Sequence, residues 1–126
     1  MDNKVFFDHV EAHVSDIKGY CEFLVKLFCG GKFKQLNENG TSMYLNPDGF
    51  AIEVKKKGEG LQPVTAGICM PCIRMENPED HVENELGLKI EKSFDLPDGK
   101  VHFFTDHENI TWHVKNYTDK DQTVNF

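Results

Sequence analysis

The C-M-P-C stretch in the middle of the chain places Cys69 and Cys72 at a spacing used by redox pairs and zinc sites. A redox pair of the thioredoxin type opens a helix, whose N-terminus lowers the pKa of the first thiol. The flanking residues Ile68, Ile73 and Met75 instead predict a strand. Residues three apart on a strand face opposite sides, so the two thiols point away from each other. We therefore interpret the stretch as part of a strand and not as a redox motif.

Zinc would need a second pair of ligands, and the remaining cysteines, Cys21 and Cys29, do not supply one. They straddle the end of a predicted helix, which is a poor spacing for a shared zinc ion. The N-terminal segment lacks a basic stretch followed by an apolar one. This predicts a cytoplasmic protein whose four cysteines are thiols.

The length, composition and charge of the chain limit its architecture and its partners. With 126 residues, 39% of them hydrophobic, the chain predicts a single domain with a core of its own. Its net charge of -7 argues against a nucleic acid or an anionic membrane as partner, since both require a basic surface. No apolar run has the length of a membrane span. These features predict no nucleic-acid partner and no membrane partner.

The second half of the chain repeats the pattern of the first. Residues 36–56 and 96–116 align at a constant offset, which brings apolar and turn residues to the same positions in both copies. Gly49 aligns with Asn109, and these residue types best tolerate a left-handed turn. The aligned apolar pairs are Leu36 with Leu96, Tyr44 with Phe104, Ile52 with Trp112 and Val54 with Val114. The segments therefore predict two copies of one strand-turn-strand unit.

In the first copy, a predicted strand and a predicted helix precede this unit. Residues 5–14 have the pattern of a strand. Ser15 and Asp16 can cap a helix whose apolar residues continue at helical spacing to Phe28. Residues 32–36 begin the next strand after a pair of glycines.

The second copy has the same lead-in with a shorter helix. Residues 68–75 form its first predicted strand. Asn77 and Pro78 open the helix, Gly87 ends it, and residues 88–94 are the next predicted strand.

Each half of the chain therefore predicts a β-α-β-β-β module, and the fold class is α+β with two tandem modules. A helix on one face of each sheet leaves the other face free, so we expect a cupped, mostly antiparallel sheet. We place the first module at about residues 5–57, a linker at about 58–65, the second module at about 66–116 and a tail at 117–126.

Two tandem modules of this kind resemble the vicinal oxygen chelate superfamily. The resemblance is carried by the pattern H-x-x-x-x-V-x-D, which begins at His9, and by P-D-G-x-x-I-E, which ends at Glu53. The superfamily includes glyoxalase I, extradiol dioxygenases, fosfomycin-resistance enzymes and bleomycin-resistance proteins. The resemblance covers nearly the whole chain, and it implies the cupped fold and a homodimer.

The resemblance also implies a metal site. The superfamily holds a divalent metal with one residue from the first and one from the fourth strand of each module, and these positions correspond here to His9, Glu53, Met70 and His113. A thioether is a poor ligand for Fe, Mn, Ni, Co or Zn, so the implied ligands are His9, Glu53 and His113. His113 stands where the superfamily usually has a glutamate, which argues against glyoxalase I activity in particular.

Alternation along the first strand adds two candidate catalytic residues. Glu11 and His13 share the face of His9. Either side chain could act as a general base. Both could instead line a polar pocket without a role in proton transfer.

The second module contributes candidate substrate-binding residues. Alternation sends Met70, Cys72 and Arg74 to the cup side of its first strand. The planar guanidinium of Arg74 could bind a carboxylate or a phosphate, or it could neutralise an acidic residue of the cup. Whichever of Phe103 and Phe104 faces the cup could pack on a ring or an acyl group of the ligand, and Phe103 is our candidate.

Two classes of function remain open. In the first, the protein is a small metal-dependent enzyme that acts on a substrate with vicinal oxygens as an isomerase, lyase, transferase or dioxygenase. In the second, it is a metal-free protein of the bleomycin-resistance type that binds a small molecule in its cup. His9 and Glu53 favour the enzyme, whereas Met70 and the absence of a glutamate at position 113 favour the binding protein.

Overall fold

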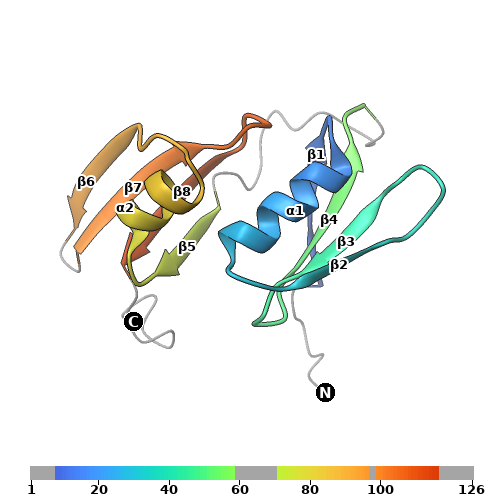
Figure 1. Ribbon diagram of the computed structural model, residues 1–126, viewed down its shortest axis with the longest axis horizontal. Coiled ribbons are helices and arrows are strands. Elements are labelled where there is room, and N and C mark those ends of the chain that lie inside the picture. The colour runs from blue at the N-terminus through green and yellow to red at the C-terminus, as the bar shows by residue number, and fades with distance from the viewer. Residues whose placement is uncertain (1–7, 59–70, 97–98, 117–126) are drawn as a thin grey trace, which may run out of the picture. The chain divides into compact units, whose positions relative to one another are not determined.

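A computed structural model describes residues 8–58, 71–96 and 99–116 of the chain (Figure 1). The chain divides into two compact units, residues 1–65 and 66–126. Each unit contains a four-stranded sheet and a helical segment. Within the described ranges, no helix has the length and apolar character that crossing a lipid bilayer requires.

The first unit has the predicted β-α-β-β-β order. Its elements are β1 (Val10–Val14), α1 (Ile17–Leu27), β2 (Lys32–Gln35), β3 (Ser42–Leu45) and β4 (Ala51–Lys56). The strand order in the sheet is β1-β4-β3-β2, in which β1 runs parallel to β4 and the other neighbours are antiparallel. The first strand in sequence therefore pairs with the last.

The second unit repeats this topology. Its elements are β5 (Cys72–Met75), α2 (Pro78–Asp80), a π-helical turn η1 (His81–Glu85), β6 (Lys92–Leu96), β7 (Gly99–Thr105) and β8 (Thr111–Asn116). The strand order is β5-β8-β7-β6, and again only the pairing of the first strand with the last is parallel. The predicted α+β class with two β-α-β-β-β modules is confirmed.

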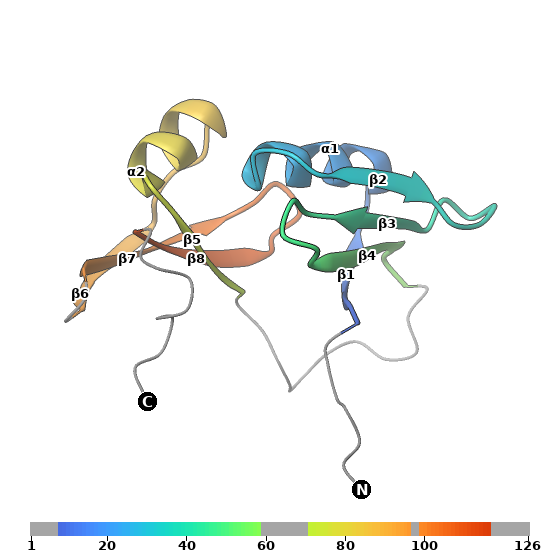
Figure 2. The ribbon, with the colours of Figure 1, turned by 90° about the horizontal axis from the view of Figure 1, so that it is seen from below.

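Helix α1 begins where the sequence predicts and packs on one face of its sheet (Figure 2). The carboxylate of Asp16 accepts a hydrogen bond from the backbone N–H of Gly19 at 3.0 Å, which satisfies a donor of the first turn. Tyr20, Leu24 and Leu27 are buried on the sheet side of the helix. Because α1 occupies this face, the opposite face of the sheet is left for polar side chains.

The helical segment of the second unit is short. Pro78 opens it, as predicted, and Val82 is its fully buried residue. The N–H of Leu86 donates to the carbonyl of His81 at 2.9 Å, a bond that spans five residues and defines the π-turn. The sequence pattern did not predict this turn, because the apolar positions Val82 and Leu86 are four residues apart, the spacing of an ordinary α-helix.

Gly87 ends this segment, as predicted, with φ at 68°. The N–H of Leu88 donates back to the carbonyl of Val82 at 2.9 Å. Leu88 thus belongs to the helix end, and the strand predicted over residues 88–94 is corrected to Lys92–Leu96.

The last hairpin of each unit is built on the same turn. Asn46 and Asp106 each accept, through Oδ1, hydrogen bonds from the N–H groups two and four residues later, at 2.8 to 3.1 Å. Gly49 and Asn109 both have positive φ, 91° and 66°, as their alignment predicted. Asp106 has one further bond, because its Oδ2 accepts from Nε1 of Trp112 at 2.9 Å.

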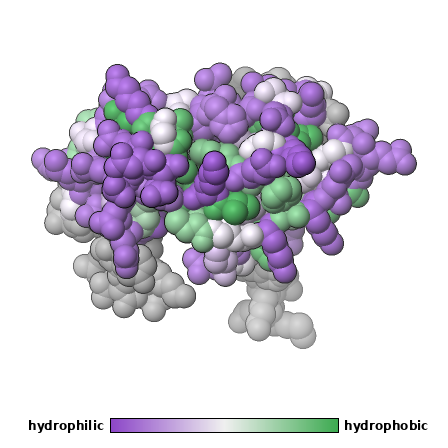
Figure 3. Space-filling view, in the orientation of Figure 1, coloured by the Kyte–Doolittle hydropathy of each residue, from purple (hydrophilic) through white to green (hydrophobic). Residues whose placement is uncertain are grey.

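Each unit buries its apolar residues between the sheet and the helix. The fully buried Tyr44 and Val54 of the first unit correspond to the fully buried Phe104 and Val114 of the second. On the face that Figure 3 shows, apolar surface gathers around α1. The large apolar side chains that remain exposed include Phe33 on β2 and Phe94 on β6.

Candidate functional site

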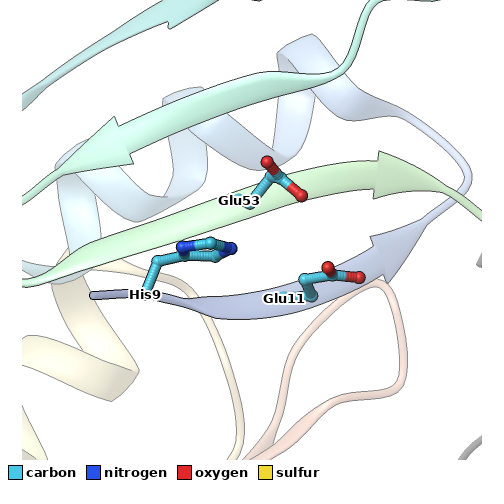
Figure 4. A group of neighbouring side chains, drawn as sticks. All are labelled: His9, Glu11 and Glu53. Atoms are coloured by element: carbon cyan, nitrogen blue, oxygen red, sulfur yellow. The ribbon is translucent and has the colours of Figure 1, made fainter. Parts of the chain in front are cut away.

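Three metal-compatible side chains meet on the face of the first sheet opposite α1 (Figure 4). His9 lies just before β1, Glu11 lies on β1, and Glu53 lies on β4. One ligand atom from each lies within 4.8 Å of the others. The parallel register sets Glu11 directly beside Glu53, because these residues are partners in the pairing of β1 with β4.

Burial along β4 shows why Glu53 points to the face opposite α1. Ile52 and Val54 are buried against the helix, so the residue between them points to the opposite face. The side chain of Glu53 retains 16% exposure, compared with 41% for Glu11. The cluster is therefore partly shielded and still open to a small ligand.

A cationic side chain lies next to both carboxylates. Nζ of Lys55 is 3.6 Å from Oε2 of Glu11 and 3.4 Å from Oε1 of Glu53. Nε2 of His13 is 3.0 Å from Oε1 of Glu11. The hydrogen bond from His13, with a smaller contribution from Lys55, lowers the pKa of Glu11, so this carboxyl is ionised at neutral pH.

His9 is oriented by the residue before it. Its Nδ1 lies 2.7 Å from Oδ2 of Asp8, and this hydrogen bond is the main cause that raises the pKa of His9. In the neutral imidazole, an Nδ1–H donated to Asp8 leaves the lone pair on Nε2. Ligand histidines of metal sites commonly donate their second ring nitrogen to a carboxylate in this way. The sequence interpretation missed Asp8, although a carboxylate directly before a predicted ligand is a readable signal.

The remaining predicted ligand, His113, lies on β8 of the second unit. Its ring stacks on that of Phe103, with the centroids 5.1 Å apart and the planes at 17°. Its Nδ1 is buried and has no hydrogen-bond partner among the described residues. Burial, and to a smaller extent Lys115, lowers the pKa of His113, so the ring is neutral at pH 7 and keeps a lone pair available.

The other predicted residues of the second unit lie on β5. Cys72 is exposed and is the register partner of His113, which confirms the strand interpretation for this half of the C-M-P-C stretch. Nη1 of Arg74 donates to the carbonyl of Asn116 at 3.0 Å. Met70 and Cys69 lie outside the described residues.

The structure thus brings together His9 and Glu53 of the predicted metal set, and it adds Glu11, which we expected to be a base. His113 belongs to the second unit. Its participation in the same site remains a prediction, as do the cup and the catalytic roles of Glu11 and His13.

Comparison with known proteins gives a fold and not an activity. No family model matches the sequence, and no curated protein matches it. Solved structures do match. A glyoxylase/bleomycin resistance protein/dioxygenase domain from Frankia sp. EAN1pec is 18% identical with a TM-score of 0.67, over 94% of this chain and 96% of that chain. The chain has the vicinal oxygen chelate fold.

Two further structures with the vicinal oxygen chelate fold extend this comparison. The fosfomycin resistance protein FosX from Listeria monocytogenes, in complex with Mn(II) and a sulfate ion, is 16% identical with a TM-score of 0.67, over 95% of this chain and 96% of that chain. An integron cassette protein from V. cholerae is 18% identical with a TM-score of 0.61, over 94% and 99% of the two chains.

On this vicinal oxygen chelate scaffold, the donor set of the first unit suits a divalent metal. One imidazole and two carboxylates are ligands that Mn, Fe, Co, Ni and Zn all accept. The residues fit such an ion in a second respect, because the hydrogen bond from Nδ1 of His9 to Asp8 leaves the lone pair of Nε2 for a metal.

Proposed function

We propose that this protein is a metal-dependent enzyme that acts on a small substrate with two adjacent oxygens. The observation that carries the proposal is the convergence of His9, Glu11 and Glu53, with the His9 ring oriented by Asp8. The reaction class is that of an isomerase, lyase, transferase or dioxygenase. The FosX structure with Mn(II) supports the proposal by showing that this fold can hold such an ion.

In this proposal, His9, Glu11 and Glu53 hold a divalent metal, and His113 of the second module joins them as a fourth ligand. The metal supplies Lewis-acid chemistry at the substrate oxygens. Lys55 then serves to balance the two carboxylates before the ion binds, since its Nζ is within 4 Å of both. His13, hydrogen-bonded to Glu11, is the side chain next to the cluster that can exchange a proton with the substrate.

The alternative is a metal-free protein that binds a small molecule. One observation favours it: Lys55 lies within 4 Å of both Glu11 and Glu53, and His13 hydrogen-bonds to Glu11, so each carboxylate has a partner without a metal. The stacked Phe103 and His113 would then supply a binding surface without chemistry.

The test is a metal titration of the chelator-stripped protein with Mn(II), Fe(II), Co(II), Ni(II) and Zn(II). We expect one ion per chain, with affinity reduced at least about tenfold by Glu53→Gln and by His9→Ala, because each removes one ligand. Glu38→Gln is the matched control, since Glu38 is an exposed carboxylate in a loop outside the cluster.

The result also separates the two functions. If the folded wild type binds none of these ions, the enzyme proposal is wrong and the metal-free binding protein stands. If His113→Ala binds metal as tightly as the wild type, the ion is held by the first module alone.

The proposal extends to a cytoplasmic homodimer, which the resemblance to the vicinal oxygen chelate superfamily implies. Light scattering on the purified protein tests this part directly. If the protein is a monomer, the dimer part of the proposal is wrong, and the proposed metal site of one chain is unaffected.

A further inference from the structure

The second sheet has a face opposite its helix that combines aromatic rings with basic side chains. We call it the open face of the second sheet. Trp112 and Val114 are buried on the helix side of β8, so the residues that alternate with them point to the open face. The side chains of this face include Arg74, Lys92, Phe94, Phe103, His113 and Lys115.

Three aromatic rings form an apolar platform on this face. Phe103 and His113 are register partners on β7 and β8, and their rings stack with centroids 5.1 Å apart. Phe94 on β6 sets its ring edge-on to Phe103, at 5.9 Å and 86°. Phe94 retains 53% exposure, the largest value among the exposed large apolar side chains of the described residues. A planar ring can cover this platform in the offset or edge-to-face arrangement that aromatic pairs prefer.

Positive charge surrounds the platform. Arg74 and Lys115 are register partners on β5 and β8, and Lys92 is the register partner of Phe103. Among the described strand residues of the open face, none is a carboxylate. A cationic face on a chain with a net charge of -7 does not follow from the overall composition, and it selects for an anion.

The spacing between ring and charge limits the size of the ligand. His113 and Lys115 are two residues apart on one strand, and positions of that kind are separated by about 7 Å. A ring over Phe103 and His113 therefore places a carboxylate at Lys115 and Arg74 if one or two carbons join the two groups. The guanidinium of Arg74, whose Nη1 also donates to the carbonyl of Asn116, adds a second positive charge to that of Lys115 at this position.

We propose that the open face of the second sheet binds a small aromatic carboxylate, with the ring on Phe103 and His113 and the carboxylate at Arg74 and Lys115. The inference deepens the proposed function, because it names the class of substrate. The binding step itself uses only residues of the second module and requires no metal, so it can be tested separately.

The experiment is an NMR titration of the full-length, chelator-stripped protein with 3-phenylpropionate. Two analogues accompany it: 3-phenylpropylamine, which keeps the ring and reverses the charge, and propionate, which keeps the charge and lacks the ring. We expect saturable shifts on β7 and β8 with 3-phenylpropionate, and at least about tenfold weaker binding of both analogues, since each loses one of the two contacts.

Two variants assign the contacts. Phe103→Leu keeps the apolar volume and removes the ring, and Lys115→Met removes the charge and keeps the chain length. We expect each to raise the Kd about two- to tenfold, the range for one aromatic or one charge contact at an exposed site. Lys34→Met is the matched control, because Lys34 occupies on β2 the position that Lys92 occupies on β6. It should leave the Kd unchanged.

The outcomes separate this inference from the proposed function. Equal or tighter binding of the amine, or shifts confined to the first module, would overturn the inference while the metal titration stands on its own. Binding of 3-phenylpropionate by a protein that takes up no metal would support the inference and leave the metal-free alternative as the function.

Discussion

The two modules share a backbone and differ in what they present on the face opposite the helix. One row of register partners crosses each sheet at corresponding positions. The row of the first sheet is Glu11, Glu53, Met43 and Lys34, and the row of the second is Cys72, His113, Phe103 and Lys92. Two carboxylates in the first module are thus replaced by a thiol and an imidazole in the second, and a thioether by a phenyl ring.

Several helix-facing positions do not diverge in this way. Tyr44 and Phe104 correspond and are both fully buried, as are Val54 and Val114. A residue packed between sheet and helix must be apolar or hydrogen-bonded, as Ser42 and its counterpart His102 are, because an unpaired polar group there would cost about 2–7 kcal/mol by transfer estimates. The opposite face carries no such constraint, so one module can offer ligands for a cation while the other offers a ring platform with positive charge.

The largest expected effect concerns the turn that both modules share. Asp106→Asn keeps the Oδ1 acceptor and replaces Oδ2, so the buried Nε1–H of Trp112 loses its partner. We expect a loss of about 1–3 kcal/mol in the free energy of unfolding, measured by urea denaturation. The reciprocal change, Asn46→Asp, should alter it by less than about 0.5 kcal/mol, because Ile52 stands where the second module has Trp112. Equal losses at both positions would show that the tryptophan bond adds nothing.

A smaller effect is expected at Lys55, the lysine next to the two carboxylates of the first module. Lys55→Met removes the cation that competes with a metal for Glu11 and Glu53. Loss of these two ion pairs corresponds to metal binding that is about 2- to 30-fold tighter, measured by titration of the stripped protein. Lys115→Met, at the corresponding position of the second module, should change it less than about twofold, because its register neighbours Arg74 and Val101 include no carboxylate. Weaker binding by Lys55→Met would mean that the lysine orders the carboxylates and does not compete.

The smallest effect is expected from exchanging the left-handed turn residues. Gly49→Asn and Asn109→Gly should each change the free energy of unfolding by less than about 0.5 kcal/mol, because both residue types tolerate positive φ. Gly49→Val is the contrasting variant and should cost more, about 1–2 kcal/mol, because a β-branched residue disfavours positive φ while a Cβ at this position meets no atom within 4 Å. A large loss for either exchange, seen by thermal denaturation, would show that the two turns are not equivalent.

The repeat made the fold predictable because each turn, cap and apolar position appears twice in the sequence. The alignment of Gly49 with Asn109 predicted two left-handed residues, and both have positive φ. The site was predictable only in part. Alternation put Glu11 on the face of His9, but its contact with Glu53 depends on the register of β1 against β4, which no local pattern encodes.

Two other features of the site depend on side-chain rotamers. The hydrogen bond between His9 and Asp8 requires one orientation of the imidazole ring. Two consecutive residues can form such a bond only when the local backbone brings their side chains together. The stack of Phe103 on His113 likewise follows from the antiparallel register of β7 with β8. The sequence placed Phe103 and His113 in the second module but did not predict that their rings stack.

The parallel pairing of the first strand with the last has a consequence for synthesis on the ribosome. Val10 is synthesised well before its partner Ile52, and Cys72 well before His113. The antiparallel strands β2, β3 and β4 can pair locally as they emerge, whereas β1 has to wait for β4, and such non-local pairing is the slow step of folding. Because Glu11 and Glu53 lie on those two strands, a nascent first module acquires its candidate metal centre only when its sheet closes.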